Sequence, residues 1–137
     1  MIMMQLTAGD LLPLQVESDI VLTRQAMRRI TVELGFGLID QTKFVTAASE
    51  LARNTIEHGG GGEVLIERLQ DGARRGLRAT FIDHGPGIAD LNLALTDGYT
   101  TGKGMGLGLS GSRRLVNEFT INSVVGQGTR VSITRWR

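Results

Sequence analysis

The sequence has 137 residues, with 15 Lys and Arg against 14 Asp and Glu, so its formal net charge is only +1. This balance excludes the broad basic surface that nonspecific nucleic-acid binding uses, and the absence of cysteine excludes disulfides, thiolate metal sites and cysteine nucleophiles. Hydrophobic residues at 41% and charged residues at 21% predict a single globular domain over residues 1–137. The chain starts with neither a basic segment nor a long apolar run, so we expect a cytoplasmic protein without membrane contact.

Two amphipathic helices are predicted in the first half of the chain. Alternation at 14–17 indicates a short strand, after which Ser18 offers an N-cap oxygen to a helix that ends near Gly35. Asp40 can cap a second helix, which runs to the glycines that begin at Gly59. Each helix has one apolar face to bury; the residues that form these faces are Ile20, Met27, Ile30, Leu34, Phe44, Ala47, Ala48 and Leu51.

The second half of the chain is rich in hairpin signals. The pattern predicts strands at 63–69 and 77–83, a helix at 90–96, a glycine-rich loop at 98–108, a helix at 110–118, and strands at 119–125 and 129–136. Asp71-Gly72 begins the turn of the first hairpin, and Gly126-Gln127-Gly128 forms the turn of the second. Because hairpins dominate the sheet, the sequence predicts an α+β sandwich rather than a doubly wound fold.

Glu50 and Asn54 lie four residues apart on the second predicted helix, away from its apolar face, so their side chains stack on one side. A carboxylate and an amide oxygen so placed could serve proton transfer or a hard cation. Mg²⁺ needs few protein oxygens when waters and substrate phosphates complete its coordination. The alternative is a solvated polar pair, which the spacing alone favours.

Asp83 stands at the end of a predicted strand and is followed by Gly85-Pro86-Gly87. Its carboxylate can accept a hydrogen bond from an exocyclic amine such as that of adenine, and Gly87 lets a planar ring approach the main chain. The alternative is a simple Pro-Gly turn after a hairpin strand, which is the commoner meaning of such a pair.

A glycine-rich segment, Gly102-Lys103-Gly104-Met105-Gly106-Leu107-Gly108-Leu109, opens onto the helix predicted at 110–118. Glycines before a helix N-terminus expose N–H donors that suit phosphate oxygens. The segment is neither a Walker A loop nor a dinucleotide fingerprint that follows a strand. Taken alone it is either a phosphate cradle or a flexible loop, with Lys103 as a phosphate contact or a solvated lid residue.

In their order and spacing, four motifs resemble the boxes of the GHKL nucleotide-binding superfamily, which includes gyrase, Hsp90, sensor histidine kinases and anti-sigma kinases. They are Glu50-Leu51-Ala52-Arg53-Asn54 for the N box, Asp83-x-Gly85-x-Gly87 for G1, Gly104-x-Gly106-x-Gly108 for G2 and Gly126-x-Gly128-Thr129 for G3. The resemblance implies a GHKL (Bergerat) ATP-binding sandwich, with a mixed, mostly antiparallel sheet covered on one face by helices.

Further segments are similar to the RsbT-type switch kinases of the bacterial general stress pathway. They are Asp97-Gly98-Tyr99-Thr100-Thr101, Gly111-x-Arg113-Arg114-Leu115 and the ending Ile133-Thr134-Arg135-Trp136. This resemblance implies an ATP-dependent serine/threonine-protein kinase that phosphorylates a STAS-domain antagonist protein. Its output would be a change of partners in a stress or sigma-factor pathway, with a PP2C-type phosphatase or a similar regulator downstream.

The resemblance also implies a role for each matching residue. Asn54 would hold Mg²⁺, Glu50 would be the general base, and Asp83 would receive the adenine amino group. The other nucleotide-binding residues would be Gly85, Gly87 and Thr129 near the base, and Lys103, Gly104, Met105, Gly106, Leu107 and Gly108 in a lid that wraps the phosphates.

Two other functions compete with the kinase. One is an anti-sigma factor that acts chiefly by sequestering a sigma factor, with nucleotide tuning the choice of partner. Arg53 in the N box and Asp97-Gly98-Tyr99 favour the kinase over it. The other is a nucleotide-binding interaction module without turnover, which would not need the base that Glu50 supplies.

Overall fold

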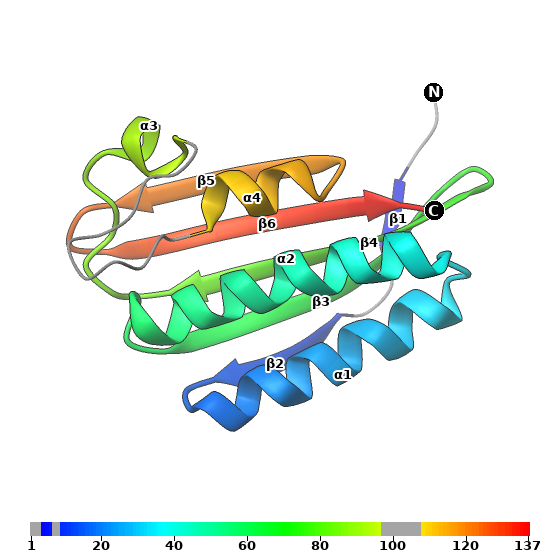
Figure 1. The fold of residues 1–137 in the computed structure, drawn as a ribbon, viewed down its shortest axis with the longest axis horizontal. Coiled ribbons are helices and arrows are strands. Elements are labelled where there is room, and N and C mark those ends of the chain that lie inside the picture. The colour runs from blue at the N-terminus through cyan, green and yellow to red at the C-terminus, as the bar shows by residue number, and fades with distance from the viewer. Residues whose placement is uncertain (1–3, 7–8, 97–107) are drawn as a thin grey trace.

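The computed structural model describes residues 4–6, 9–96 and 108–137. In chain order its elements are β1 (Met4–Leu6), β2 (Asp10–Leu14), α1 (Glu17–Glu33), α2 (Leu38–Glu57), β3 (Gly62–Asp71), β4 (Arg74–Asp83), α3 (Leu91–Ala94), α4 (Leu109–Arg114), β5 (Glu118–Val124) and β6 (Gly128–Trp136). The described strands form a six-stranded sheet, and α1, α2 and α4 lie on one face of it (Figure 1). The predicted α+β sandwich is confirmed.

The strand order brings distant motifs to one end of the sheet. The order is β1-β3-β4-β6-β5, with β2 also pairing with β3, and all pairings of the described strands are antiparallel. In the β4–β6 pair, Ile82 lies opposite Arg130. The end of β4, with Asp83, therefore lies beside the start of β6, with Thr129.

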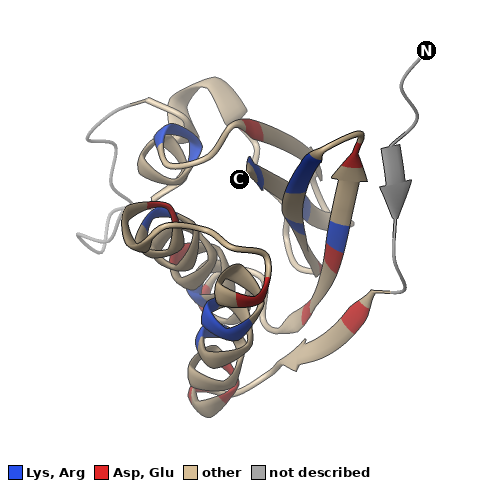
Figure 2. Cartoon of the chain, turned by 90° about the vertical axis from the view of Figure 1, so that its right-hand side faces the viewer, with Lys and Arg blue, Asp and Glu red and all other residues tan. Residues whose placement is uncertain are grey.

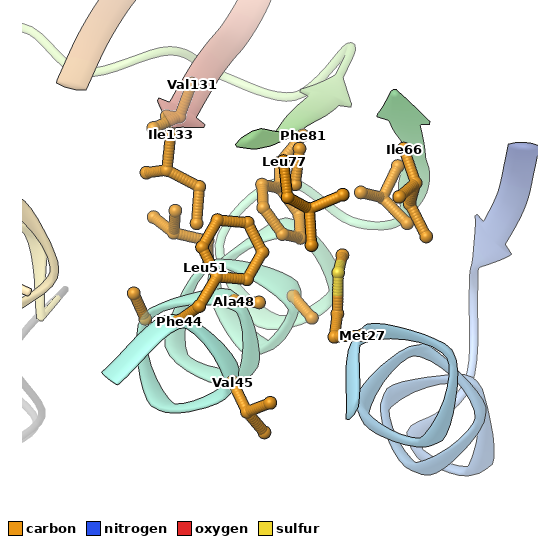
Figure 3. Packing of buried hydrophobic residues seen from close by; sticks show 14 of the residues in the cluster. Met27, Phe44, Val45, Ala48, Leu51, Ile66, Leu77, Phe81, Val131 and Ile133 are labelled. Atoms are coloured by element: carbon orange, nitrogen blue, oxygen red, sulfur yellow. The ribbon is translucent and has the colours of Figure 1, made fainter. Parts of the chain in front are cut away.

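The core lies between the sheet and the two long helices. Figure 3 shows Phe44 and Leu51 of α2 facing the strands and Val45 pointing away from them, while Met27 of α1 reaches toward the strands. The buried residues labelled there are Met27, Phe44, Val45, Ala48, Leu51, Ile66, Leu77, Phe81, Val131 and Ile133. Burial of each large apolar side chain favours the fold by about 1.5–3 kcal/mol, so this layer holds α2 firmly on the sheet.

The start of α1 differs from the prediction. The strand predicted at 14–17 is instead β2, which ends at Leu14, and Ser18 lies inside the helix, where Val16 takes the N-cap position. The Asp19 carboxylate accepts the backbone N–H groups of Gln15 at 2.9 Å and Val16 at 3.1 Å. These hydrogen bonds lower the pKa of Asp19 below its ordinary value. A carboxylate in the first turn also lies near the positive end of the helix dipole, so Asp19 stabilises the start of the helix better than the Ser18 hydroxyl would.

The start of α2 also differs, although its end at Glu57 agrees with the predicted stop before the glycines. Gly37 takes the N-cap position, and Asp40, the predicted cap, lies in the first turn. The Asp40 carboxylate instead accepts a hydrogen bond from Arg135 Nη2 at 2.6 Å. This ion pair ties the start of α2 to the end of β6.

Both predicted hairpins are present, but the helix predicted at 110–118 is shorter. It ends at Arg114, because the chain is already pairing with β6 by Asn117. The Asn117 N–H donates to Thr134 O at 2.9 Å, and Asn117 Oδ1 accepts the Trp136 N–H at 2.7 Å. The helix predicted at 90–96 is the short α3, whose first turn Asp90 caps.

Charged residues of both signs are spread over the helices and strands (Figure 2). Arg68 of β3 donates to Glu33 of α1 at 2.6 Å, and this contact lowers the pKa of Glu33. Among the described helices, none combines the length and the apolar character needed to cross a membrane.

Candidate functional site

A pocket lies where α2 passes the ends of β4 and β6. It encloses about 340 Å³ of empty space, part of it continuous with solvent. Its lining residues are Leu51, Asn54, Thr55, His58, Phe81, Asp83, Ile88, Leu109, Thr129 and Val131. Apolar walls with a few polar groups are typical of pockets that bind a small ligand.

Asp83 is the charged group of the pocket and is only 8% exposed. Its Oδ1 atom accepts two backbone N–H groups, from Gly85 at 2.9 Å and from Thr129 at 3.2 Å. Within the described residues Oδ2 has no such partner, so it can accept a hydrogen bond from a ligand. Asp83 thus fastens the segment after β4 to the start of β6 and still presents an acceptor to the pocket.

Thr129 is buried and belongs to a small network that includes Ser123 of β5. The two hydroxyl oxygens lie 2.8 Å apart. Ser123 Oγ also accepts the backbone N–H of Ile88 at 2.8 Å and lies 3.3 Å from the carbonyl oxygen of Gly128. The sequence analysis missed Ser123. The signal was available, because alternation along 119–125 places a serine on the same side as Phe119 and Ile121.

Gly85 and Gly87 are required by close packing of the backbone. A Cβ atom at Gly85 would lie 2.6 Å from the carbonyl oxygen of Gly59. Gly87 has a φ of +76°, and a Cβ atom there would lie 2.6 Å from Val124 O. Gly85 and Gly87 thus let the segment after β4 lie against the end of α2 and the turn between β5 and β6.

Asn54 lines the pocket beside Leu51, the last residue of the apolar face predicted for this helix. The expectation that Asn54 lies on the opposite side of the helix from the apolar residues is therefore wrong. It lies at the boundary, half-buried, because the apolar face extends one turn further through Thr55. Asn54 is thus the residue by which α2 contributes an amide group to the pocket.

Glu50 is exposed and lies outside the pocket lining, one turn before Asn54. Its Oε2 atom is 3.0 Å from where a Cβ atom of Gly108 would lie, so the carboxylate faces the residue that precedes α4. Glu50 also lines an open groove between α1 and α2, together with Arg24, Arg28 and Arg53. The carboxylate therefore stands between the pocket and a surface that another molecule can reach.

The other predicted phosphate-binding residues, Lys103, Gly104, Met105, Gly106 and Leu107, lie outside the described residues. Gly108 is described and has a φ of +66°. In the part of the chain that the structure describes, no cluster of three His, Cys, Asp or Glu residues could hold a metal ion. The pocket fits a Mg²⁺ ion that enters with a substrate, because such an ion takes one or two protein oxygens and Asn54 can supply one.

Comparison with known proteins agrees with this geometry. Residues 39–136 match the family model described as histidine kinase-, DNA gyrase B- and HSP90-like ATPase. The chain therefore belongs to this ATPase family, the GHKL family, whose members use a nucleotide.

Within the family, the chain is 45% identical over 120 residues to the serine/threonine-protein kinase RsbT of Bacillus subtilis strain 168, covering 88% of this chain and 90% of that protein. A crystal structure of the RsbU and RsbW domains of a Mycobacterium tuberculosis protein is also similar, with a TM-score of 0.64 and 22% identity. That match covers 96% of this chain and 33% of the other, and it supports the fold. The enzyme class is therefore that of the RsbT-type serine/threonine-protein kinases.

Proposed function

We propose that this kinase transfers the γ-phosphoryl group of Mg-ATP to a serine or threonine of a STAS-domain antagonist protein, and that this transfer switches partners in a stress-response pathway. Release from the antagonist would let the kinase act on a further regulator, such as a PP2C-type phosphatase. The observation that carries the proposal is the convergence of Asn54, Asp83 and Thr129 on one pocket, with Glu50 at its border.

Each residue has a role that its position supports. Asp83 Oδ2 would accept the amino group of adenine, with Thr129 beside it and Gly85 and Gly87 shaping the backbone around the base. Asn54 would supply an amide oxygen to Mg²⁺, which when bound offsets the negative charge of the phosphates. This arrangement suits phosphoryl transfer, which depends mainly on positioning and electrostatic stabilisation.

Glu50 would act as the general base. Its carboxylate would take the proton of the partner's hydroxyl while that oxygen bonds to the γ-phosphorus and the bond from the γ-phosphorus to the bridging oxygen of ADP breaks. Glu50 is exposed and opens onto the groove between α1 and α2, so a protein substrate can present its hydroxyl there. The lid residues Lys103, Gly104, Met105, Gly106, Leu107 and Gly108 would contact the phosphates.

The test is a phosphorylation assay with Mg-ATP labelled at the γ-phosphate and a candidate STAS-domain protein. Glu50→Gln should keep ATP binding within about threefold and lower the rate of transfer by about 10²-fold or more, since general-base catalysis contributes on that scale. Glu57→Gln is the matched control, because Glu57 is a carboxylate on the same helix that pairs with Arg53 at 4.0 Å and lies outside the pocket lining.

The possible results separate the competing functions. Transfer that is lost in Glu50→Gln and kept in Glu57→Gln supports the kinase with Glu50 as its base. Transfer that survives in both variants would place the base elsewhere. Tight ATP binding by the wild-type protein with no transfer to any STAS-domain partner would contradict the proposal and favour a sequestering anti-sigma factor.

A further inference from the structure

Ser123 lies at a junction of three segments around the pocket. From β5 it contacts Ile88, which follows the Asp83 segment, and it contacts Gly128 and Thr129 at the start of β6. Its Oγ atom thus has three polar neighbours, which are the Ile88 N–H at 2.8 Å, Gly128 O at 3.3 Å and Thr129 Oγ1 at 2.8 Å. None of the family motifs identified in the sequence includes this residue.

The hydrogen-bonding capacity of a hydroxyl decides the direction of these contacts. A serine hydroxyl has one proton and two lone pairs. Because Gly128 O can only accept, the Ser123 proton must go there if all three contacts are to be hydrogen bonds. Ser123 then accepts from the Ile88 N–H with one lone pair and from the Thr129 hydroxyl with the other. The Thr129 proton is therefore used by Ser123.

This arrangement fixes what Thr129 can offer to a ligand. With its proton donated to Ser123, Thr129 Oγ1 presents only lone pairs to the pocket. Asp83 Oδ2 also presents only lone pairs, since a carboxylate is an acceptor. The wall that β4 and β6 form therefore carries two acceptors, whereas the other polar lining residues, Asn54, Thr55 and His58, come from α2 and its end. Two neighbouring acceptors suit an amino group and oppose a carbonyl oxygen. Adenine carries an amino group at the position where guanine carries a carbonyl.

We propose that Ser123 is a positioning residue that sets the preference of the pocket for a 6-aminopurine, by holding the Thr129 hydroxyl as an acceptor. The inference rests on the proposed nucleotide site and adds a residue that acts through Thr129. It predicts that loss of the Ser123 hydroxyl weakens ATP binding more than GTP binding, because the freed Thr129 proton can then turn toward the pocket and donate to a carbonyl.

The test compares dissociation constants for Mg-ATP and Mg-GTP, measured by titration calorimetry, in the wild-type protein and in Ser123→Ala. We expect the constant for ATP to rise about five- to tenfold, on the scale of one lost hydrogen bond, and the constant for GTP to change by less than about twofold. Ser123→Thr keeps a hydroxyl and should restore the wild-type ratio. The ratio of the two dissociation constants is informative even if a variant is less stable, because partial unfolding weakens the apparent binding of both nucleotides equally.

Ser132→Ala is the matched control. Ser132 is a half-buried serine of β6 whose Oγ atom lies 2.9 Å from Thr80 Oγ1, and it lies outside the pocket lining. This variant should leave the ratio of the two constants unchanged. If Ser123→Ala leaves the ratio of the two dissociation constants unchanged, including by weakening the binding of both nucleotides equally, the inference is overturned and Ser123 has only a structural role.

A second measurement asks whether Ser123 acts through Thr129. Thr129→Val removes the hydroxyl but keeps the branched shape, so Ser123→Ala should change the ratio little when combined with it. If the effects of the two substitutions on the free-energy difference between ATP and GTP binding were fully additive, the inference would be contradicted. Failure of the wild-type protein to bind either nucleotide would instead refute the proposed function, whereas binding of ATP without preference over GTP would refute only the role of Ser123.

Discussion

At the scale of the residue, Asp83 combines a structural role with the binding role proposed for it in one carboxylate. Oδ1 joins the backbone of Gly85 to that of Thr129, and Oδ2 is left for a ligand. Two backbone N–H groups would lose their partner if the side chain were removed. The side chain at this position must therefore accept on one atom, and in the proposed site the other atom would determine which base the pocket prefers.

Asp83→Asn separates these two roles. Asparagine keeps an oxygen for the two N–H groups but replaces the second acceptor by a donor. We expect ATP affinity to fall about tenfold or more and the preference for ATP over GTP to shrink, with thermal stability changed little. Competition binding with the two nucleotides checks this. An unaltered preference would argue against contact between Asp83 and the base.

Asn54→Ala should abolish the Mg²⁺-dependent part of ATP binding, because Asn54 is the proposed protein ligand of the ion. The measurement is ATP affinity with Mg²⁺ and with excess EDTA. In the wild-type protein the two affinities should differ, and in the variant they should be nearly equal. An unchanged affinity for Mg-ATP in the variant would exclude this role of Asn54.

Residue spacing on one helix is enough to predict that Glu50 and Asn54 lie on neighbouring turns of one side of α2, because positions four apart share a face. Spacing could not place Asn54 relative to the pocket wall, since the wall is completed by β4 and β6. Alternation indicates on which side of its strand Ser123 lies, but for the same reason it could not predict the partners of Ser123. Its three partners lie five or more residues away along the chain, and only the sheet register brings them together.

At the scale of the element, the contact between β3 and β4 depends on a glycine that the sequence does not mark as special. A Cβ atom at Gly62 would overlap the carbonyl oxygen of Ile82 and would lie 2.9 Å from Thr55 Cγ2. Gly62→Ala should lower the free energy of unfolding by about 1–3 kcal/mol, because the strand or α2 must shift.

The control for this prediction is Gly111→Ala in α4. A Cβ atom at Gly111 meets no atom within 4 Å, so alanine should be neutral or raise the free energy of unfolding by up to about 1 kcal/mol. Urea unfolding followed by the fluorescence of Trp136, the one tryptophan, measures both variants. Equal stability of the two variants would contradict the expected clash at Gly62.

The first turn of α1 should make stability depend on pH. The hydrogen bonds from Gln15 and Val16 lower the pKa of Asp19, so its contribution is present above the pKa of the unfolded chain and is lost as the pH falls through the lower pKa of the folded protein. Asp19→Asn should therefore reduce stability at neutral pH, and the difference from wild type should shrink in acid.

Unfolding midpoints in urea at neutral pH and at about pH 3 measure this effect. Ser18→Ala is the control and should change neither midpoint, because Ser18 lies inside the helix rather than at its cap. A loss of stability in Ser18→Ala equal to that in Asp19→Asn would contradict the assignment of Asp19.

Periodicity predicted the helices and hairpins well because they bury one face against a common core. It failed at the ends of the helices, because single contacts determine at which residue a helix begins or ends. The predicted cap Asp40 pairs with Arg135, almost one hundred residues later. The chain already hydrogen-bonds to β6 at Asn117, so the helix ends before its predicted end. Such contacts join residues that are distant along the chain, so the local sequence does not indicate them.

At the scale of the whole molecule, the pocket is built from both halves of the chain. Its walls come from α2 in the first half and from β4, α4 and β6 in the second. A ligand bound there therefore stabilises the assembled domain against unfolding rather than one element.

Mg-ATP at about 100 times its dissociation constant should raise the free energy of unfolding by about 2.7 kcal/mol, since the ligand binds only the folded state. Trp136 is a suitable reporter because its ring packs on Gly76 and under Arg74, outside the pocket lining. Asn54→Ala should show little of this gain. An equal gain in the variant would mean that ATP binds without Asn54.

The doubled duty of the Asp83 carboxylate also bears on how nucleotide preference can change over evolution. A substitution at Asp83 alters the ligand contact and the backbone anchor together, so most replacements would harm folding before they could create a new preference. Ser123 is a similar anchor, because its Oγ atom contacts the Ile88 N–H and the Gly128 carbonyl oxygen. Among the described residues, the Thr129 hydroxyl contacts only Ser123. Descendants of this kinase with a different nucleotide preference would therefore be expected to have changed first at Thr129 and last at the aspartate.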